Sequence, residues 1–391
     1  MTFSSRQLLI GFLTVTFAAS AEEPKVGGGF SIPQPDPVLS FPADHGSHPG
    51  FRIEWWYLTG HLFADEGKRR FGVQATFFRM AQKPGENEGG TGWQSDPLYL
   101  AHMALTDVAN DRFLHEERLN RAGWDAWSKV GDLDVRNGNW TLKRVEGLGP
   151  GSALSESADG LMTLNGSLQS EACYELKLRP MKPPVLFGER GVSRKGESPE
   201  AASLYLTFPR LAAEGTVEMD GDAVAVSGEL WMDHEISSSQ LGRDQVGWDW
   251  ISIQLFDGRE LMAYVLRKPD GTPDRFSSLA WVDESGKVTN VDVDDFVWRS
   301  EGKWQSDVTG DVYPVRPRLS VTDPVSGQER TFRFEPVMEA QELSGGLGGV
   351  SYWEGAGDVI DESSGEAVGR AYLELTGYAK GDDLGRRLRG D

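Results

Sequence analysis

The chain has 391 residues, more than one hydrophobic core usually supports, so two domains are expected. Its 13 tryptophans and hydrophobic fraction of 39% indicate well-filled interiors and exclude a largely disordered chain. A net charge of -21 repels phosphate backbones and anionic headgroups, so we do not expect nucleic acid as a partner.

The first 21 residues have the composition of a signal peptide. Arg6 precedes a short apolar run at residues 8–18, and Ala19-Ser20-Ala21 offers small residues for cleavage. The run is about half as long as a membrane-spanning helix requires, and no later segment is apolar enough to cross a bilayer. We therefore expect a secreted or periplasmic bacterial protein that does not span the membrane. Residues 22–40 form a leader rich in Gly and Pro, which predicts an extended tether.

Beyond the leader, the sequence predicts an all-β fold of mostly antiparallel strands. Apolar and polar residues alternate in residues 71–77 and 371–376, which is the period of a half-buried strand. Dipeptides typical of tight hairpin turns recur along the chain: Asn137-Gly138, Asp159-Gly160, Asn165-Gly166, Asp220-Gly221, Asp257-Gly258 and Asp270-Gly271. Cys173 is the only cysteine, so no intrachain disulfide can form.

Matching segments in the two halves indicate an internal duplication. Residues 55–63 (WWYLTGHLF) align with residues 248–256 (WDWISIQLF), and residues 228–232 (GELWM) are echoed by residues 369–373 (GRAYL). We therefore expect two consecutive antiparallel barrels, with an N-terminal domain at 41–238, a C-terminal domain at 239–380 and a polar tail at 381–391. A barrel of about eight strands can hold one small ligand in its interior.

Acidic and histidine side chains interrupt the apolar pattern where two neighbouring strands end and begin. One set follows an apolar strand and opens the next: Asp233, His234, Glu235 and Asp249. The first half carries a related set: His45, His48, Glu54 and His61. These groups are separated by short connections, so we expect them to gather at one rim.

Three kinds of chemistry suit these polar residues. Burial beside aromatic rings would raise the pKa of Asp233, which could then donate a proton to an alkene while His234 or Glu235 takes a proton from water. A metal ion could instead be held by His45, His48, His234 and a carboxylate, but the spacing is not diagnostic, and we expect no metal and no other cofactor. The third interpretation is structural: an Asp-His pair that caps a strand end.

Aromatic side chains surround the polar residues and predict an apolar ligand. The side chains expected to contact it are Trp55, Tyr57, His61, Trp231, Trp248, Asp249 and Trp250. The alternative is that the tryptophans at the start of the first strand, Trp55 and Trp56, close the base of a barrel.

Residues 54–62, 231–235 and 247–250 resemble motifs of the AttH-like family, also called the carotenoid 1,2-hydratase (CrtC)-like family or "predicted secreted hydrolases". The similarity extends from about residue 41 to residue 379 and implies two lipocalin-like (calycin) domains. In the hydratase branch an Asp-His pair and a tyrosine belong to the site, which by resemblance points to Asp233, His234 and Tyr264. Ile236 stands where that branch has an aromatic residue, so the exported branch is the closer match.

Two functions follow from the resemblance. Characterised relatives hydrate or cyclise isoprenoid and polyketide-like substrates, which implies a hydro-lyase or hydrolase-like enzyme with Asp233, His234, Glu235 and Tyr264 as catalytic residues. Other members are encoded beside ABC-type permeases, which implies a periplasmic carrier of a lipid or another hydrophobic molecule. Replacement of Asp233 by Asn would separate the two, because only an enzyme would lose turnover while it retains binding.

Overall fold

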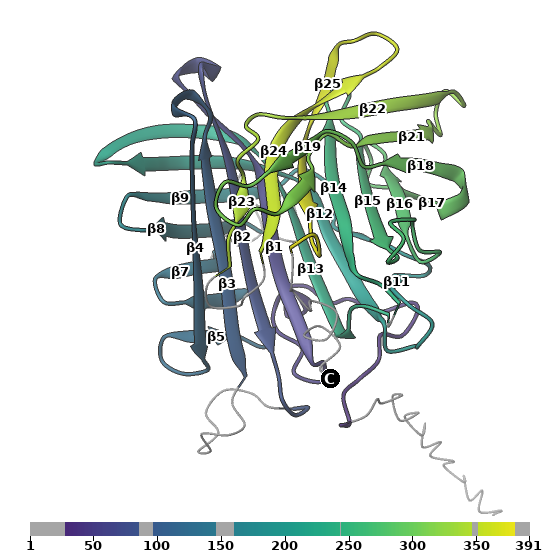
Figure 1. Cartoon of the computed structure of the whole chain (residues 1–391). Helices are drawn as coiled ribbons and strands as arrows, with labels where there is room; N and C mark the ends of the chain where they lie inside the picture. Colours follow the sequence, from purple (N-terminus) through teal and green to yellow (C-terminus); the bar gives the residue numbers. More distant parts are fainter. Residues whose placement is uncertain (1–27, 86–96, 146–159, 243, 346–350, 380–391) are drawn as a thin grey trace, which may run out of the picture.

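The structure is a computed structural model that describes residues 28–85, 97–145, 160–242, 244–345 and 351–379 (Figure 1). Within these residues the only helical elements are short 3-10 turns: η1 (Ala43–His45), η2 (Asp65–Gly67), η3 (Val108–Asn110) and η4 (Val293–Asp295). The all-β prediction is therefore confirmed. None of the described helices has the length and apolar character needed to cross a membrane. The expected signal peptide, residues 22–27 of the leader and the polar tail lie outside the described residues.

The first sheet has 13 strands and curls into a nearly closed barrel. Its strands are β1 (Ile53–Ala64), β2 (Arg69–Met80), β3 (Leu98–Asp107), β4 (Arg112–Arg121), β5 (Ala126–Ser128), β6 (Asp134–Asn137), β7 (Trp140–Arg144), β8 (Met162–Leu168), β9 (Ala172–Pro180), β10 (Val185–Leu186), β11 (Val192–Arg194), β12 (Ala202–Met219) and β13 (Asp222–Ser239). The spatial order is β4-β3-β2-β1-β13-β12-β9-β8-β7-β6-β5, and β10 and β11 also pair with β12.

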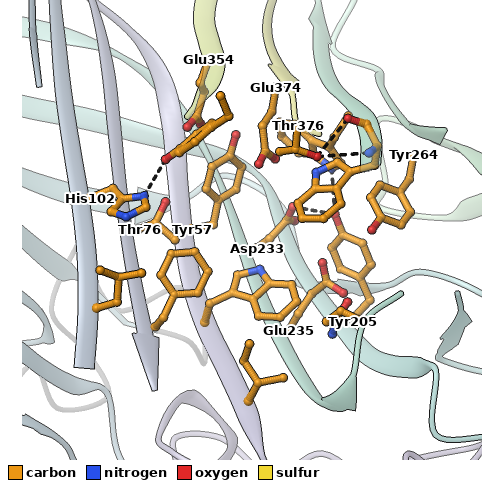
Figure 2. Close-up of a pocket in the computed structure, with 18 of the residues that line it drawn as sticks. Tyr57, Thr76, His102, Tyr205, Asp233, Glu235, Tyr264, Glu354, Glu374 and Thr376 are labelled. Atoms are coloured by element: carbon orange, nitrogen blue, oxygen red, sulfur yellow. Dashed lines mark hydrogen bonds between the residues drawn. The ribbon is translucent and has the colours of Figure 1, made fainter. Parts of the chain in front are cut away.

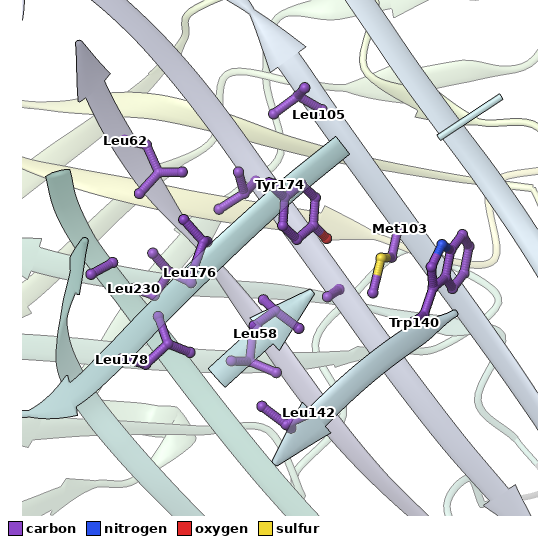
Figure 3. Packing of buried hydrophobic residues seen from close by; sticks show 14 of the residues in the cluster. Leu58, Leu62, Met103, Leu105, Trp140, Leu142, Tyr174, Leu176, Leu178 and Leu230 are labelled. Carbon is purple, nitrogen blue, oxygen red and sulfur yellow. The ribbon is translucent and has the colours of Figure 1, made fainter. Parts of the chain in front are cut away.

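Side chains complete the closure of this barrel where the backbone ladder stops. Asn137 on β6 donates a hydrogen bond from Nδ2 to the Tyr99 carbonyl on β3 at 3.0 Å, and its Oδ1 accepts one from Asn120 on β4 at 2.6 Å. The interior is filled by buried apolar side chains from all sides (Figure 3): Leu58, Leu62, Met103, Leu105, Trp140, Leu142, Tyr174, Leu176, Leu178 and Leu230.

The second sheet has 10 strands in the same antiparallel arrangement. Its strands are β14 (Gly247–Leu255), β15 (Glu260–Arg267), β16 (Ser278–Val282), β17 (Val288–Val291), β18 (Phe296–Arg299), β21 (Arg318–Thr322), β22 (Glu329–Pro336), β23 (Glu342–Leu343), β24 (Tyr352–Asp361) and β25 (Ala367–Leu375). The order is β17-β16-β15-β14-β25-β24-β22-β21-β18, with β23 beside β24. A separate hairpin consists of β19 (Lys303–Gln305) and β20 (Val312–Pro314). Together the two sheets form the two lipocalin-like barrels expected from the sequence.

The duplicated strands of the two halves meet at the interface between the barrels (Figure 1). In β1, Trp56 and Leu58 belong to the core of the first barrel, whereas Tyr57 belongs to the cluster that joins the two barrels. In β14, Ile251 lies in the core of the second barrel and Trp250 lies in the joining cluster. The alternation of side chains along a strand therefore gives each barrel one filled inner face and one apolar outer face.

Polar contacts also cross this interface and hold the barrels against each other. Glu260 on β15 is fully buried and pairs with Lys182 and Arg210 of the first half, at 2.6 Å and 2.7 Å. Gly72 on β2 permits the close approach, because a Cβ atom there would lie only 2.8 Å from the Cβ atom of Ala356 on β24.

The described part of the leader, from residue 28 to residue 40, packs against the first barrel. Phe30 is only 1% exposed, the Ser31 amide donates to the Gly50 carbonyl at 2.8 Å, and the Ser238 hydroxyl donates to the Ser31 carbonyl at 2.7 Å. This segment is therefore part of the folded body, in contrast to the extended tether that its composition predicts.

One of the turn predictions is wrong. Asn165-Gly166 lies inside β8, whereas Asp220-Gly221, Asp257-Gly258 and Asp270-Gly271 lie between consecutive strands. Asn137 ends β6 and Gly138 begins the turn to β7, and Asp159 lies outside the described residues. Gly166 is required there by packing, because a Cβ atom would lie 2.3 Å from the sulfur of Met103. Gly166 is therefore explained by its packing against Met103 and not by a turn.

Candidate active site

A cavity of about 140 Å3 lies between the two barrels (Figure 2). Its walls are largely aromatic and include seven of the site residues expected from the sequence: Trp55, Tyr57, Asp233, Glu235, Trp248, Trp250 and Tyr264. A barrel interior was expected to hold the ligand, but both interiors carry packed apolar cores. The hollow lies instead where the outer faces of the duplicated strands meet.

The two halves contribute corresponding positions to this cavity. Tyr57 on β1 pairs with Asp233 on β13, and in the second half Trp250 on β14 pairs with Glu374 on β25. Because strand residues alternate between faces, Asp233 and Glu235 both point into the cavity from β13. The repeat therefore places one acidic side chain from each half at the interface.

Asp233 is held by three hydrogen-bond donors although it is only 1% exposed. Its Oδ2 accepts from the Tyr205 hydroxyl at 2.7 Å, and its Oδ1 accepts from the Thr207 hydroxyl at 2.5 Å and from Trp231 Nε1 at 2.7 Å. Burial raises the pKa of Asp233 to about 7, against the opposing effect of these donors. The group can therefore exchange a proton near neutral pH, as a general acid or base must.

Glu235 lies beside Asp233 and forms an ion pair with a buried ammonium group. Lys195 Nζ is fully buried and lies 2.8 Å from Glu235 Oε2. The same ammonium group lies 4.0 Å from the ring centre of Tyr264, a contact typical of cation-π attraction. Glu235 therefore holds Lys195 over the aromatic wall.

Glu354 on β24 is the least satisfied polar group of the cavity. It is fully buried, and neither carboxyl oxygen has a hydrogen-bond partner among the described residues. Burial, together with the charge of Glu374, raises the pKa of Glu354 well above its ordinary value, while the nearby Tyr57 and Tyr352 hydroxyls oppose the shift. The physical result is a carboxyl group kept in its neutral form, because burial and the charge of Glu374 outweigh the effect of the two tyrosine hydroxyls.

Glu374 is a second carboxyl group with a raised pKa. Burial and the charges of Glu235 and Asp233 raise the pKa of Glu374 to about 7, and the Trp248 indole and Lys195 oppose the shift. Four carboxyl groups thus line the cavity, and the pKa values of two of them, Asp233 and Glu374, lie near 7. The Lys195 ammonium group lies behind the wall, paired with Glu235.

His234, predicted as a water-orienting base, lies on the opposite face of β13 and does not line the cavity. Its ring stacks on Trp56 with centroids 4.8 Å apart, and its Nε2 contacts Glu54 Oε1 at 2.8 Å. Alternation along the strand explains this placement, since neighbours of Asp233 must point to the barrel interior.

Three of the residues considered for a metal do gather at this place, inside the first barrel. The ligand atoms of His48, Glu54 and His234 lie within 4.8 Å of one another, and His45 is not part of the group. Glu54 Oε1 contacts His48 Nδ1 and His234 Nε2 at 2.8 Å each, and His48 Nε2 contacts Asp44 at 3.0 Å. These hydrogen bonds account for the proximity of the three side chains without an ion.

The other predicted ligand contacts take supporting positions. His61 donates from Nε2 to the Ala371 carbonyl at 3.0 Å and so links the two barrels. Trp231 acts through its hydrogen bond to Asp233. Asp249 points into the second barrel, where it accepts hydrogen bonds from Trp298 and Tyr378, at 2.9 Å each.

Sequence reasoning missed Tyr205, His102, Tyr352, Glu354 and Glu374. One of them carried a signal: the match of residues 228–232 with 369–373, continued by one position, aligns Asp233 with Glu374. The others lie outside the duplicated segments, and only the packing of one barrel on the other brings them to the cavity.

The comparisons with known proteins agree with this architecture. A crystal structure of a candidate AttH from Nitrosomonas europaea is 35% identical, with a TM-score of 0.74 over 88% of this chain and 99% of that chain. Kievitone hydratase from Nectria haematococca has a TM-score of 0.60 at 14% identity, over 91% of this chain and 98% of that one. The structure of CghA with Sch210972 has a TM-score of 0.51 at 15% identity, over 92% and 99%. These last two show a shared fold.

A search of curated proteins found no match. The sequence profile of the AttH-like family matches residues 32–378, nearly the whole described part of the chain, in agreement with the resemblance noted in the sequence. The chain therefore belongs to the AttH-like family.

Proposed function

We propose that the protein is a hydratase that adds water to a carbon-carbon double bond of an isoprenoid-like ligand held between the two barrels. The observation that carries the proposal is the pairing of two unlike acids in one aromatic cavity. The carboxyl oxygens of Glu354 accept no hydrogen bond from the described residues and burial favours its neutral form, whereas Asp233 has three donors and a pKa of about 7.

Glu354 is the better proton donor of the two. A neutral carboxyl group without a hydrogen-bond partner is free to donate to the weakly basic π-bond of a ligand. This assignment differs from the sequence-based hypothesis, in which Asp233 donates. The difference arises because the three donors around Asp233 stabilise its charged form.

Asp233 then acts as the general base. The proton of Glu354 forms a bond to one alkene carbon, and water adds its oxygen to the other carbon while Asp233 takes a proton from that water. The electron-rich faces of Tyr57, Trp248 and Trp250 stabilise the positive charge that develops between these events. Transfer of one proton from Asp233 to Glu354 restores the starting state.

The volume of the cavity limits what it can enclose. A cavity of roughly 150 Å3 holds one benzene ring, so about 140 Å3 accommodates one five-carbon unit. Ile53, Phe78, Met80 and Leu100 continue the apolar lining along β1, β2 and β3. We infer that a terminal isoprene unit fills the cavity against this apolar lining and that the rest of the chain extends out of the cavity. The hydratase activity named for one structural relative supports this reaction class.

The test uses geraniol and farnesol as probes, with oleic acid as a ligand that has no isoprene unit. Each is incubated with the protein in oxygen-labelled water, and products are analysed by mass spectrometry. We expect addition of one labelled water to a prenyl probe, lost in both Glu354→Gln and Asp233→Asn although both variants still bind the probe. Binding without any product in the unchanged protein would contradict the proposal.

That last outcome would favour the alternative, a carrier of a hydrophobic molecule that works with an ABC-type envelope transporter. We also propose that the protein acts outside the cytoplasm, on the strength of its N-terminal sequence. Fractionation of the native cells tests the location, since recovery of the mature protein from the cytoplasm would contradict it.

A further inference from the structure

Gln240 lies on the connection between the two barrels and lines the cavity. It follows the last residue of β13, Ser239, and the connection continues to the start of β14 at Gly247. Gln240 is only 2% exposed, yet its side-chain nitrogen Nε2 is buried and has no hydrogen-bond partner among the described residues. Because an unpaired buried amide costs free energy, packing alone does not explain a polar side chain at this position.

A second glutamine of the same connection shows the contrast. Gln245 donates from Nε2 to the Lys195 carbonyl at 2.7 Å, and its Oε1 accepts from the Gly242 amide at 2.8 Å. Gln245 thereby fixes the path of the connection. The Nε2 group of Gln240 forms no such bond with the described residues, so the fold of the connection does not depend on this donor.

The cavity has an acidic end and an apolar end, and Gln240 lies at the apolar one. On β1 and β13, Tyr57 pairs with Asp233 and Ile53 pairs with Ser237. Four residues of strand span about 13 Å, so Ile53 lies about this far along the sheet from Asp233. Gln240 comes after Ser237 in the chain, beyond the end of β13. A ligand group bound by Gln240 would therefore lie at the opposite end of the cavity from Asp233.

The amide group and the charges around it favour an uncharged oxygen. An N–H donor needs an acceptor, which an ammonium group lacks. A carboxylate of the ligand would meet four carboxyl groups in the cavity wall, and the Lys195 ammonium group is already paired with Glu235. A hydroxyl group carries no charge. Because it both donates and accepts, it can pair with either polar atom of the Gln240 amide as the amide turns.

We propose that Gln240 determines the specificity of the cavity by binding a hydroxyl group of the ligand. The ligand is then a prenyl alcohol and not a hydrocarbon or an acid. The proposal rests on the proposed function, which places the double bond of the same ligand beside Glu354 and Asp233. A hydrocarbon would leave the Gln240 amide buried without a partner, and by such a loss a binding site rejects a ligand that lacks one polar group.

The test measures the binding of three probes with one carbon skeleton: geraniol, myrcene, which has no oxygen, and geranic acid, which is ionised at neutral pH. Dissociation constants come from the quenching of tryptophan fluorescence, since Trp55, Trp248 and Trp250 line the cavity. The readout is the Kd of myrcene divided by the Kd of geraniol. We expect Gln240→Met, which keeps the length of the side chain, to lower this ratio by about three- to tenfold, because only the alcohol loses a hydrogen bond.

Gln245→Met is the matched control. It removes an amide from the same connection but outside the cavity, so the stability should fall while the ratio stays unchanged. Gln240→Met should unfold at urea concentrations no lower than the unchanged protein, because its Nε2 group forms no hydrogen bond with the described residues.

An equal ratio in Gln240→Met and in the unchanged protein would overturn the proposal, and so would the same change of ratio in Gln245→Met. A marked loss of stability in Gln240→Met would also overturn it, since the amide would then have a structural role. Without any variant, binding of geranic acid as tight as that of geraniol would do the same. Because only binding is measured, a protein that hydrates no alkene can still show this preference, and failure of the preference leaves hydration to be judged by its own assay.

Discussion

The hydroxyl of Thr207 provides a direct test of how the cavity sets the charge of Asp233. It donates to Asp233 Oδ1 at 2.5 Å inside the buried interface, and valine has nearly the same shape without the donor. We expect Thr207→Val to raise the pKa of Asp233 above its value of about 7, because the charged form loses one of three donors. A higher pKa makes Asp233 a carboxyl group that is mostly neutral at pH 7.

The size of the shift follows from the energy of the bond. A hydrogen bond to a charged group is worth about 1.5 to 3 kcal/mol, and one pKa unit corresponds to about 1.4 kcal/mol. The pKa of Asp233 should therefore rise by about one to two units. The remaining donors, Tyr205 and Trp231, set the upper limit because they still stabilise the carboxylate.

The measurement is a pH titration of carbon-13-labelled aspartate by NMR, with Asp233→Asn to identify the resonance. Thr59→Val is the matched control, because the Thr59 hydroxyl is buried in the neighbouring strand but has no hydrogen-bond partner among the described residues. It should leave the titration of Asp233 unchanged. An unchanged or lowered pKa in Thr207→Val would refute the view that these donors control the charge of Asp233.

Three further predictions concern stability. The pKa of Asp233 rises on folding from 3.8 to about 7. The free energy of unfolding should therefore fall by on the order of 4 kcal/mol as the pH rises from about 4 to 7. Asp233→Asn should remove this part of the pH dependence, as measured by urea titrations at pH 5 and pH 8. Glu260→Gln should destabilise the protein by about 3 kcal/mol in the same assay, because Lys182 is left buried without its countercharge; an effect below about 1 kcal/mol would contradict this. Gly72→Val should lower the free energy of unfolding by about 1 to 3 kcal/mol through a clash with Ala356, and a variant as stable as the parent would show that the barrels separate at no cost.

Period-two patterns and the internal repeat were sufficient to predict two antiparallel barrels, because both depend on local sequence. They also identified most of the aromatic wall, since Trp55 and Tyr57 recur as Trp248 and Trp250. The face of the sheet on which each of these residues lies could also be predicted from the sequence. Asp233 and His234 are neighbours in a strand and must face opposite sides, so the two could not both contact one ligand.

What the sequence could not supply is the docking of one barrel on the other. Glu354 and His102 come from strands outside the repeat and reach the cavity only because their sheets pack face to face. Their importance lies in what surrounds them, namely a missing partner for Glu354 and a neighbouring tyrosine for His102. Neither property has a signature in residue spacing.

Duplication explains why Asp233 and Glu374 face each other across the site, and residues outside the repeat explain why the carboxyl groups of the site differ. Asp233 and Glu374 occupy matching positions of the repeat, and burial at the interface between the barrels raises the pKa of each to about 7. A site with these two groups alone would have no clear donor and acceptor. Glu354 breaks the equivalence, because it adds a carboxyl group without donors on one side of the cavity. Lys195 breaks it again by neutralising Glu235 on the other side. In the proposed hydration, the direction of proton transfer therefore depends on residues outside the duplicated motif. Glu354→Gln removes the unlike acid, so this variant should lose hydration while the fold and the cavity persist.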